Sequence, residues 1–353
     1  MAYRGSRYTG YRGRSRSVLK GVIVALAVVL ALAVAALIML ENQQVFSGEG
    51  LHLGNVGQSE TPTPSDTTPL VVVTVSPTPT PTPEPTAPVR IAGLPASALT
   101  DGTAAQQVQA AGASAAVFDL KGDDGVLQYV SSLTLAAQGG ANGSGETRNA
   151  DIQALNEGDL YTVARVSCFR DNKVPYYVPT LGIKTNSNYN WRDGGDYRWL
   201  SPTNADARQY VTDICVELAR LGFDEILLDN SAYPTDGHLE YIRKGDAYDA
   251  AQFETVVTDF YAQVKSALAA YPDVRLSIVT DSATLLSGSN AVSSQSVAGM
   301  TASADRLWVE LGESTLTDVQ TALAGQGVEL PADALVPIAD AAGDASSSWA
   351  TLP

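Results

Sequence analysis

Cysteine and histidine are both scarce in this chain of 353 residues, which contains two of each. Cys168 and Cys215 are too few for a disulfide scaffold or a cysteine-based zinc site, and His52 and His238 are too few for a histidine-rich metal centre. We therefore expect no metal and no cofactor. The cysteines leave two interpretations open, a disulfide between them or two small residues buried in the core.

Basic residues are outnumbered, with 22 Lys and Arg against 38 Asp and Glu and a formal net charge of -16. Residues 1–40 hold six of the basic residues and no acidic one, so they carry +6 and the rest of the chain carries -22 (-16 less +6). An acidic body repels phosphate groups. Nucleic acid is therefore excluded as an expected partner.

The N-terminal 40 residues have the pattern of a membrane anchor. Residues 1–20 are predicted to be a basic, disordered cytoplasmic tail, and residues 21–40 a transmembrane helix, because about 20 apolar residues span a bilayer. The positive charges before this run place the N-terminus in the cytoplasm and the rest outside. A cleaved signal peptide is the alternative, but its apolar core is normally only about 7–15 residues long and ends at small residues. The following Glu41-Asn42-Gln43-Gln44 offers no such site.

Residues 41–88 are rich in threonine and proline, with proline at every second position over much of the segment. Such a composition favours extended conformations and cannot form a packed core. We predict a disordered linker that holds residues 89–353 away from the membrane. The protein is thus expected to be a single-pass protein of the cell membrane with an extracellular C-terminal domain.

Residues 89–353 have the length and the pattern of one α/β domain, because about 260 residues is the usual size of a TIM-type (β/α)8 barrel. Apolar runs that alternate with helical stretches predict a parallel sheet with right-handed crossovers. An eighth strand could only lie around residues 349–352, so closure at the last strand is left open, and an open doubly wound sheet is the alternative. The predicted strands are 89–94, 115–120, 160–169, 225–229, 275–280, 306–311 and 334–339. The predicted helices lie near 103–111, 149–157, 204–221, 249–270, 315–325 and, more weakly, 287–300.

The ends of the predicted strands carry polar residues on the face that also carries the apolar inner residues. In the strand 225–229, Glu225, Leu227 and Asp229 share one face, because side chains alternate with period two. Barrels of this class place their active sites at the C-terminal ends of the strands. The polar residues expected to converge there are Asp119, with Lys121 beyond it, Arg165, Asp229, Asp281 and Glu310.

Asp229, Asp281 and Glu310 are the predicted catalytic residues, because crowded carboxylates acquire different pKa values and can divide into acid and base or nucleophile. Asp281 has an alternative role as the cap of a following helix. Glu310 could instead be exposed or paired with Arg306. Asp229 is harder to explain as a cap, since no helix starts directly after it.

Arg165 lies in the middle of a predicted strand, where a charge that faces a barrel interior needs a partner. Two interpretations follow, a structural ion pair with Asp119 or Asp229, or a clamp for substrate. We predict that Arg165, Asp119 and Lys121 bind substrate.

Two long loops, 170–203 and 230–248, are rich in tyrosine and tryptophan and are expected on the same rim of the barrel. Flat aromatic faces suit the stacking of sugar rings, and loops on a rigid barrel are where binding groups are placed. Alternatively, these aromatics pack the interiors of the loops. Trp191 and Tyr233 are predicted to be exposed and to bind substrate.

Four segments, in order along the chain, resemble a family of known proteins. They are Phe118–Gly125, Tyr161–Asp171, Trp199-Leu200-Ser201-Pro202 and Gly222–Ile226. Together they are similar to the bacterial DUF4015 family of glycoside-hydrolase-like TIM barrels, which is related to alpha-amylase-like enzymes, over about residues 89–340. The chain is a divergent member in this comparison. Asn230–Pro234 replaces a Tyr-x-Arg-Phe-Pro element, and Glu310–Ser314 replaces a Tyr-Pro-Ser-His-like segment.

The resemblance implies a membrane-anchored glycoside hydrolase that acts on a cell-envelope or environmental polysaccharide through its strand-end carboxylates. The alternative is a catalytically inactive barrel that binds cell-wall glycan or an envelope protein. A carboxyl pair that shares an open cleft would favour the enzyme, whereas a Glu310 turned outward would favour the binding protein.

Overall fold

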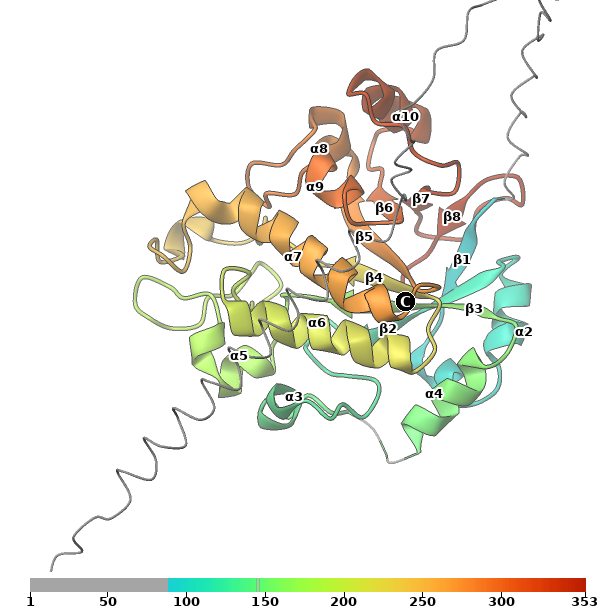
Figure 1. Ribbon diagram of the computed structural model, residues 1–353, viewed down its shortest axis with the longest axis horizontal. Helices are drawn as coiled ribbons and strands as arrows, with labels where there is room; N and C mark the ends of the chain where they lie inside the picture. Colours follow the sequence, from blue (N-terminus) through green and yellow to red (C-terminus); the bar gives the residue numbers. More distant parts are fainter. Residues whose placement is uncertain (1–87, 144, 146) are drawn as a thin grey trace, which may run out of the picture. The chain divides into compact units, whose positions relative to one another are not determined.

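The computed structural model describes residues 88–143, 145 and 147–353, and these residues contain a closed barrel of eight parallel strands in chain order (Figure 1). The α/β barrel predicted from the sequence is therefore confirmed. The basic tail 1–20, the predicted membrane helix 21–40 and all but the last residue of the linker 41–88 lie outside the described residues. The strands are β1 (Arg90–Gly93), β2 (Ala115–Lys121), β3 (Tyr161–Ser167), β4 (Glu225–Asp229), β5 (Arg275–Asp281), β6 (Arg306–Glu310), β7 (Leu335–Ile338) and β8 (Trp349–Ala350).

A very short eighth strand closes the barrel, and the alternative of an open doubly wound sheet is wrong. In β8, Ala350 pairs with Ile338 of β7 on one side and with Ile91 of β1 on the other. The chain after β8 passes so close to β1 that a Cβ atom on Gly93 would lie 2.4 Å from the carbonyl carbon of Leu352. Closure therefore depends on the absence of a side chain at residue 93.

Helices cover the outside of the barrel. The longest, α6, begins after Asn204, whose side chain accepts hydrogen bonds from the backbone N–H groups of Asp206 and Ala207 and so caps the helix. The stretch 287–300 is not one helix as predicted, because it contains the end of α8, a loop and the start of α9. The α-helices are α2 (Ala104–Ala110), α3 (Thr134–Gln138), α4 (Arg148–Asn156), α5 (Val174–Tyr177), α6 (Ala205–Arg220), α7 (Phe253–Ala267), α8 (Ser282–Ser287), α9 (Val297–Thr301) and α10 (Leu316–Gly325). Single 3-10 turns are η1 (Ala96–Leu99), η2 (Pro179–Leu181), η3 (Leu239–Tyr241), η4 (Ala250–Gln252) and η5 (Leu268–Ala270).

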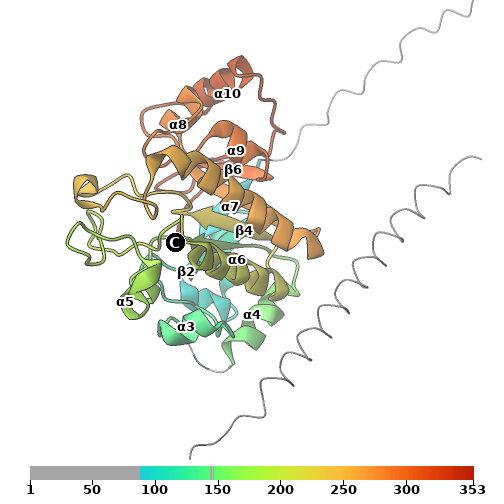
Figure 2. The same cartoon turned by 60° about the vertical axis from the view of Figure 1, so that its left-hand side comes forward.

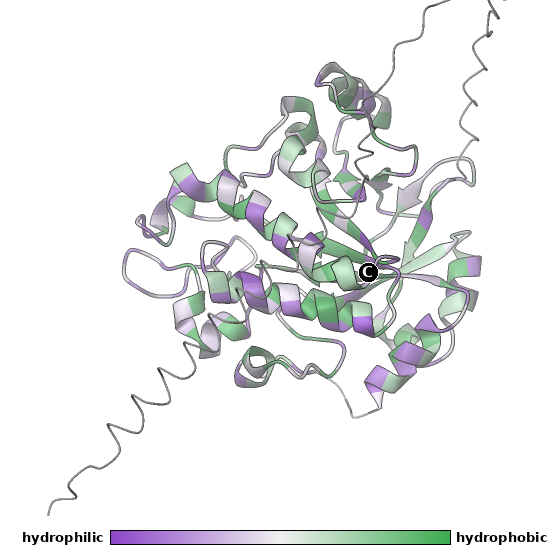
Figure 3. Ribbon diagram, viewed as in Figure 1, coloured by the Kyte–Doolittle hydropathy of each residue, from purple (hydrophilic) through white to green (hydrophobic). Residues whose placement is uncertain are grey.

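The core has two parts, one between the helices and the strands and one inside the barrel. Strands are predominantly hydrophobic, whereas the long helices α6 and α7 alternate between hydrophobic and hydrophilic residues (Figure 3). Inside the barrel every strand contributes at least one residue to a buried apolar layer, in which each Ile, Val or Leu side chain stabilises the fold by roughly 1.5–3 kcal/mol. This layer consists of Ile91, Ala115, Val117, Val163, Leu227, Val279, Trp308, Val336 and Ala350.

Below this layer, toward the N-terminal ends of the strands, the barrel interior is polar and centred on Glu225. Its carboxylate, which is fully buried, accepts hydrogen bonds from Ser277 Oγ (2.6 Å), Trp308 Nε1 (3.0 Å) and Tyr161 OH (2.8 Å), and it forms an ion pair with Arg306. A buried charge is tolerated only when it is paired and hydrogen-bonded, which this arrangement achieves. These contacts tie β3, β4, β5 and β6 together at the end of the barrel away from the strand C-termini.

Cys168 and Cys215 are both buried and both free. Of the two sequence-based interpretations, the pair of small core residues is thus confirmed, and a disulfide between these residues is not formed. Within the described part of the chain, no helix is both long and apolar enough to cross a membrane.

Candidate active site

The candidate site lies directly above the apolar layer of the barrel interior, where the strands end. Because side chains alternate with period two, the next inward positions are Asp119 on β2, Arg165 on β3, Asp229 on β4, Asp281 on β5 and Glu310 on β6. The strand register places Asp119 beside Arg165 and Asp281 beside Glu310. The structure therefore brings these five predicted residues onto one rim.

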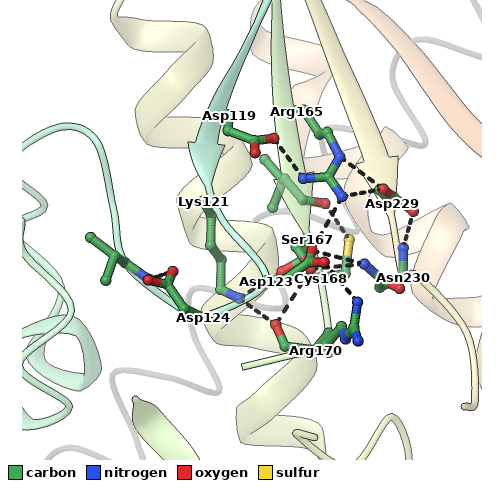
Figure 4. Close-up of polar contacts among 12 residues, drawn as sticks. Asp119, Lys121, Asp123, Asp124, Arg165, Ser167, Cys168, Arg170, Asp229 and Asn230 are labelled. Carbon is green, nitrogen blue, oxygen red and sulfur yellow. Dashed lines mark hydrogen bonds and ion pairs between the residues drawn. The ribbon is translucent and has the colours of Figure 1, made fainter. Parts of the chain in front are cut away.

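Arg165 is the electrostatic centre of this rim (Figure 4). Its Nε lies 2.8 Å and its Nη2 2.5 Å from Asp229 Oδ2, and its Nη1 lies 2.6 Å from Asp119 Oδ1. A third carboxylate, that of Asp123, lies 3.2 Å from Nη2. Burial disfavours the charge, but the carboxylates of Asp229, Asp119 and Asp123 outweigh that effect and raise the pKa of Arg165. Of the two interpretations of this arginine, the structural ion pair is confirmed.

The residue after Asp229 fixes the second oxygen of its carboxylate. Asn230 has a left-handed backbone conformation, with φ of 45°, which asparagine tolerates better than most residues. Its backbone N–H donates to Asp229 Oδ1 over 2.6 Å, and its side-chain amide donates to Ser167 Oγ (3.0 Å) and to Asp123 Oδ1 (3.2 Å). Both oxygens of Asp229 thus have protein donors, so its orientation is set before any substrate binds.

Asp123 and Arg170, neither of which was predicted as a site residue, extend the ion-pair network into the loops. Arg170 Nη1 lies 2.8 Å from Asp123 Oδ2, and Arg170 Nε lies 2.7 Å from Asp193 Oδ2, which also accepts from Trp199 Nε1 (2.9 Å). Burial opposes the ionisation of Asp123, yet Arg165 and Arg170 lower its pKa. The only sequence signals were the turn-like pattern around Asp123 and the position of Arg170 just after a strand.

A cavity of about 260 Å³ opens above this network. Its lining is strongly acidic and contains one basic residue, Arg170. The acidic residues of the lining are Asp193, Asp229, Asp236, Asp281 and Glu310. Uncharged polar groups of the lining include Asn230, Ser231, Thr235, Thr280, Ser293 and Gln295.

Asp281 and Glu310 are neighbours on the cavity wall, but their carboxyl groups have different partners. Asp281 caps α8, accepting from the backbone N–H of Thr284 (2.7 Å) and from its hydroxyl (3.0 Å), so the capping role considered from the sequence is confirmed. The carboxyl group of Glu310 is exposed and forms no hydrogen bond or ion pair with any other described residue, so the exposed position considered from the sequence is confirmed, and Arg306 pairs with Glu225 instead. Partial desolvation raises the pKa of Glu310, and the negative charges of Asp229 and Asp281 add to the effect.

Lys121 does not reach the cavity, contrary to the role in substrate binding predicted for it. Its side chain is 0% exposed, and its Nζ lies 3.1 Å from Asp171 Oδ2 and donates to the backbone carbonyl of Ser167 over 2.6 Å. In a regular strand, Lys121 would point inward like Asp119, because it lies two residues further along β2. The pairing of β2 with β3 shifts register between Asp119 and Lys121, however, so the two side chains do not share one face.

Trp191 and Tyr233 were expected to be exposed, and this expectation is wrong, because each is only 2% exposed. Trp191 packs inside its loop and donates from Nε1 to the carbonyl of His238 over 2.9 Å. Tyr233 stacks on Phe253, with ring centroids 3.5 Å apart, although it also lines part of the cavity. The alternative considered from the sequence, aromatics that pack the loop interiors, applies to both.

The arrangement combines a carboxylate paired with a cation and a carboxyl group without such a partner on one cavity wall. Such a pair can perform general acid catalysis together with nucleophilic or base catalysis. In the described residues there is no group of three or more His, Cys, Asp or Glu placed to hold a metal ion.

A family model described as "Putative glycosyl hydrolase domain" (DUF4015) matches residues 101–307, which is more than half of the chain. The matched region runs from just before α2 to the second residue of β6. No curated protein matches the chain.

Solved structures also align with the chain. A hypothetical protein from Ruminiclostridium thermocellum is 25% identical with a TM-score of 0.45, over 53% of this chain and 96% of that one. The glycoside hydrolase domain of PgaB (BpsB) from Bordetella bronchiseptica is 14% identical with a TM-score of 0.47, over 76% and 94% of the two chains. The glycoside hydrolase domain of PelA from Pseudomonas aeruginosa is 14% identical with a TM-score of 0.40, over 71% and 83%.

Proposed function

This chain belongs to the DUF4015 glycosyl hydrolase family, and from that premise we propose that it hydrolyses glycosidic bonds of a cell-envelope or environmental polysaccharide, with Asp229 and Glu310 as the catalytic pair. The observation that carries the proposal is the unequal surroundings of two carboxyl groups on one cavity. Asp229 is paired with Arg165, whereas Glu310 has no cationic partner among the described residues and has a raised pKa.

Glu310 is suited to the role of general acid. A raised pKa keeps a carboxyl group protonated nearer to neutral pH, so that it can give its proton to the departing glycosidic oxygen. Asp281 is a weaker candidate for this role, because both of its oxygens already accept hydrogen bonds from Thr284 at the start of α8. We therefore assign Asp281 to the support of the cavity wall beside Glu310.

Asp229 supplies the negative charge on the other side of the reacting carbon. In a retaining reaction its carboxylate forms a bond to the anomeric carbon as the bond to the leaving oxygen breaks and Glu310 protonates that oxygen. Water then cleaves the glycosyl-enzyme bond, with Glu310 as base. An inverting reaction would use the same groups with the carboxyl groups about 6.5–9.5 Å apart rather than about 5–5.5 Å. The anomeric configuration of the first product, read by proton NMR, distinguishes the two.

Arg165 and Asp119 act through Asp229 rather than on the substrate. Arg165 contacts both carboxylates and is largely buried, so its guanidinium orients Asp229 and balances its charge. Arg170, the one basic residue of the cavity lining, and the polar groups around it are better placed to contact hydroxyl groups of a sugar.

The location of the enzyme is proposed on the sequence alone. Residues 21–40 would cross the cell membrane once, with residues 1–20 in the cytoplasm and the barrel outside, joined by the linker 41–88. A polysaccharide is the partner that such a position makes available. Protease added to intact cells should remove the barrel and leave the basic tail protected, and protection of the barrel would contradict the topology.

An inactive barrel that only binds glycan was the alternative from the sequence. It would be favoured by a Glu310 turned outward. The side chain of Glu310 is exposed, but it lines the same cavity as Asp229, and the negative charge of Asp229 contributes to its raised pKa. The enzyme is therefore the preferred function.

The decisive experiment compares the full-length chain, purified in detergent, with its Asp229→Asn and Glu310→Gln variants. Release of reducing ends from a panel of soluble polysaccharides should fall about 100-fold or more in both variants, because each removes a group that acts in the transition state. Glu313→Gln is the matched control, since it removes an exposed carboxylate outside the cavity lining. Glycan binding with the same negligible turnover in all four proteins would contradict the proposal.

A further inference from the structure

The strongly exposed tyrosines of the barrel are confined to the two loops beside the cavity. Among the described residues, Tyr176 (56% exposed), Tyr177 (60%) and Tyr189 (75%) lie on the loop between β3 and α6, and Tyr241 (55%) lies on the loop between β4 and α7. Exposed aromatic surface is unfavourable in water, and a cluster of it marks an interaction site. The position of these tyrosines therefore indicates a ligand-binding surface on the rim of the cavity.

Backbone hydrogen bonds to residues 185 and 186 fix the positions of Tyr189 and Tyr241 relative to each other. The backbone N–H of Thr185 donates to the carbonyl of Tyr189 over 2.8 Å, and the N–H of Asn186 donates to the carbonyl of Tyr241 over 3.0 Å. Thr185 also bridges to Ile242. Residues 185–186 therefore lie between the two tyrosines, whose backbones are about 10 Å apart if each step equals the usual spacing of about 4.8 Å between strands.

His238 completes this surface, and the loop interior fixes its position. Its imidazole stacks on the ring of Tyr241, with centroids 4.9 Å apart and planes inclined by 22°, and its Nδ1 lies 2.9 Å from Glu240 Oε1. Below it, Trp191 Nε1 donates to the carbonyl of His238. The buried tryptophan thus supports an exposed aromatic group instead of forming one.

The surface is continuous with the cavity. Asp236 lines the cavity, and Gly237 follows it with φ of 92° and packs so closely on Asp193 that a Cβ atom would lie 2.9 Å from Asp193 Cα. His238 comes next along the chain. Figure 2 shows the β3–α6 and β4–α7 loops extending from the same side of the barrel.

We propose that His238, Tyr241 and Tyr189, the rim platform, bind further units of a polysaccharide whose scissile bond lies between Asp229 and Glu310. This inference rests on the proposed function and makes it more specific. Sugar rings present apolar C–H faces that stack on aromatic side chains. Because the loop backbone is already ordered, the aromatic side chains of the platform lose little conformational entropy when they bind a polysaccharide. The cavity holds the reacting unit, and the platform selects polymers over short glycosides.

The test measures binding separately from turnover, in the full-length chain carrying Asp229→Asn. The probes are glycol chitosan, hydroxyethyl cellulose, dextran and laminarin, each copolymerised into native gels to measure retardation. Tyr189→Ala with Tyr241→Ala should weaken binding of the retarding polymer about tenfold. Tyr189→Phe with Tyr241→Phe keeps both rings and should restore it. Leu286→Ala, which shortens an exposed apolar side chain on α8, should leave binding unchanged.

Failure of the platform and failure of the proposed function give different results. Loss of polymer binding in the alanine variant, with no turnover by the chain that retains Asp229, supports the platform and contradicts the hydrolase. Equal retardation of the alanine and parent proteins, or no retardation of the parent by any of the four polymers, overturns the platform. When Tyr189→Ala and Tyr241→Ala are instead introduced into the chain that retains Asp229, reducing-end release that survives on short oligosaccharides but falls on polymers supports both.

Discussion

Arg165 compensates the charges of three carboxylates, because its one guanidinium contacts Asp229, Asp119 and Asp123. Its side chain is only 10% exposed, so solvent cannot replace it as a counter-charge. A single substitution there leaves several partly buried carboxylates facing each other.

We predict that Arg165→Met lowers the free energy of unfolding by about 3 kcal/mol, as expected when one partner of a buried ion pair is removed. Turnover should fall as well, since Asp229 loses the group that orients it. Arg192→Met is the control, because Arg192 pairs with Asp196 on the surface, where such a pair contributes about 0.5 kcal/mol or less. Urea denaturation of the three proteins measures both values, and equal losses would show that Arg165 is not a buried counter-charge.

Glu310 should determine the alkaline side of the pH profile. Because desolvation and neighbouring charges raise its pKa, it stays protonated to a higher pH than an ordinary glutamate, and kcat/KM should fall as pH rises through that pKa. Residual activity of Glu310→Gln should lack this alkaline limb. An unchanged limb in the variant would assign the proton donor to another residue.

The same raised pKa of Glu310 also affects stability. A group whose pKa is higher in the folded than in the unfolded state contributes stability below the unfolded pKa and loses it as pH rises through the folded pKa. Glu310→Gln removes this loss. At neutral pH the variant should therefore be at least as stable as the parent by thermal unfolding, although it is less active, and clear destabilisation would contradict this account.

At the level of single residues, the sequence predicted those groups whose place follows from strand period alone. Asp229, Arg165 and Glu310 lie where alternation puts them, and the capping role of Asp281 follows from its position before a helix. Lys121 was misplaced because pairing becomes irregular at the end of β2. Asp123 and Arg170 could not be found, because contacts between different loops bring them together.

At the level of elements, strand alternation builds three levels inside the barrel: a polar base around Glu225, an apolar middle and the acidic rim. The alternation of side chains along each strand predicted the inward-facing residues wherever the pairing is regular, which excludes Lys121 at the end of β2. The loops were less predictable. Trp191 and Tyr233 show that an aromatic-rich loop of this length forms its own small core, so exposure cannot be read from composition.

The polar base predicts a loss of stability without a loss of chemistry. Glu225→Leu leaves the buried Arg306 with Asp333, 3.5 Å away, as its remaining carboxylate partner and should cost about 3 kcal/mol of unfolding free energy. Activity per folded molecule should hardly change, because Glu225 lies at the opposite end of the barrel from Glu310. The double variant Glu225→Leu with Arg306→Met should recover part of the loss, since apolar replacement of a buried pair is often tolerated. A double variant less stable than the single one would refute this.

At the scale of the whole molecule, the barrel closes through the short pairing of β8 with β1 and β7, which the sequence did not determine. The two-residue β8 has too few residues for a periodic pattern, which is why an open sheet remained an alternative. The length of the domain and the resemblance to a barrel family favoured closure. The membrane helix and the linker remain predictions from the sequence.

Gly93 gives a direct test of closure. Gly93→Ala would place a methyl group against the backbone of Leu352 and should cost about 1–3 kcal/mol, the usual range for overpacking. The same change at Gly325, at the end of α10, meets no atom within 4 Å and should be neutral or stabilising by about 0.5–1 kcal/mol. Opposite signs in chemical denaturation support the closure contact, and equal effects would contradict it.

The polar rim is confined to an arc. Its charged members come from β2, β3, β4, β5 and β6, whereas the corresponding inner positions of β7 and β1 are Ile338 and Gly93. One barrel is therefore subject to two kinds of selection. In β7 and β8, selection acts only on closure of the barrel, so the sequences of these strands should diverge faster among descendants of a common ancestor. Substitutions in the arc from β2 to β6 must also preserve a charge balance, and compensating pairs of changes should be the commonest way for that arc to evolve.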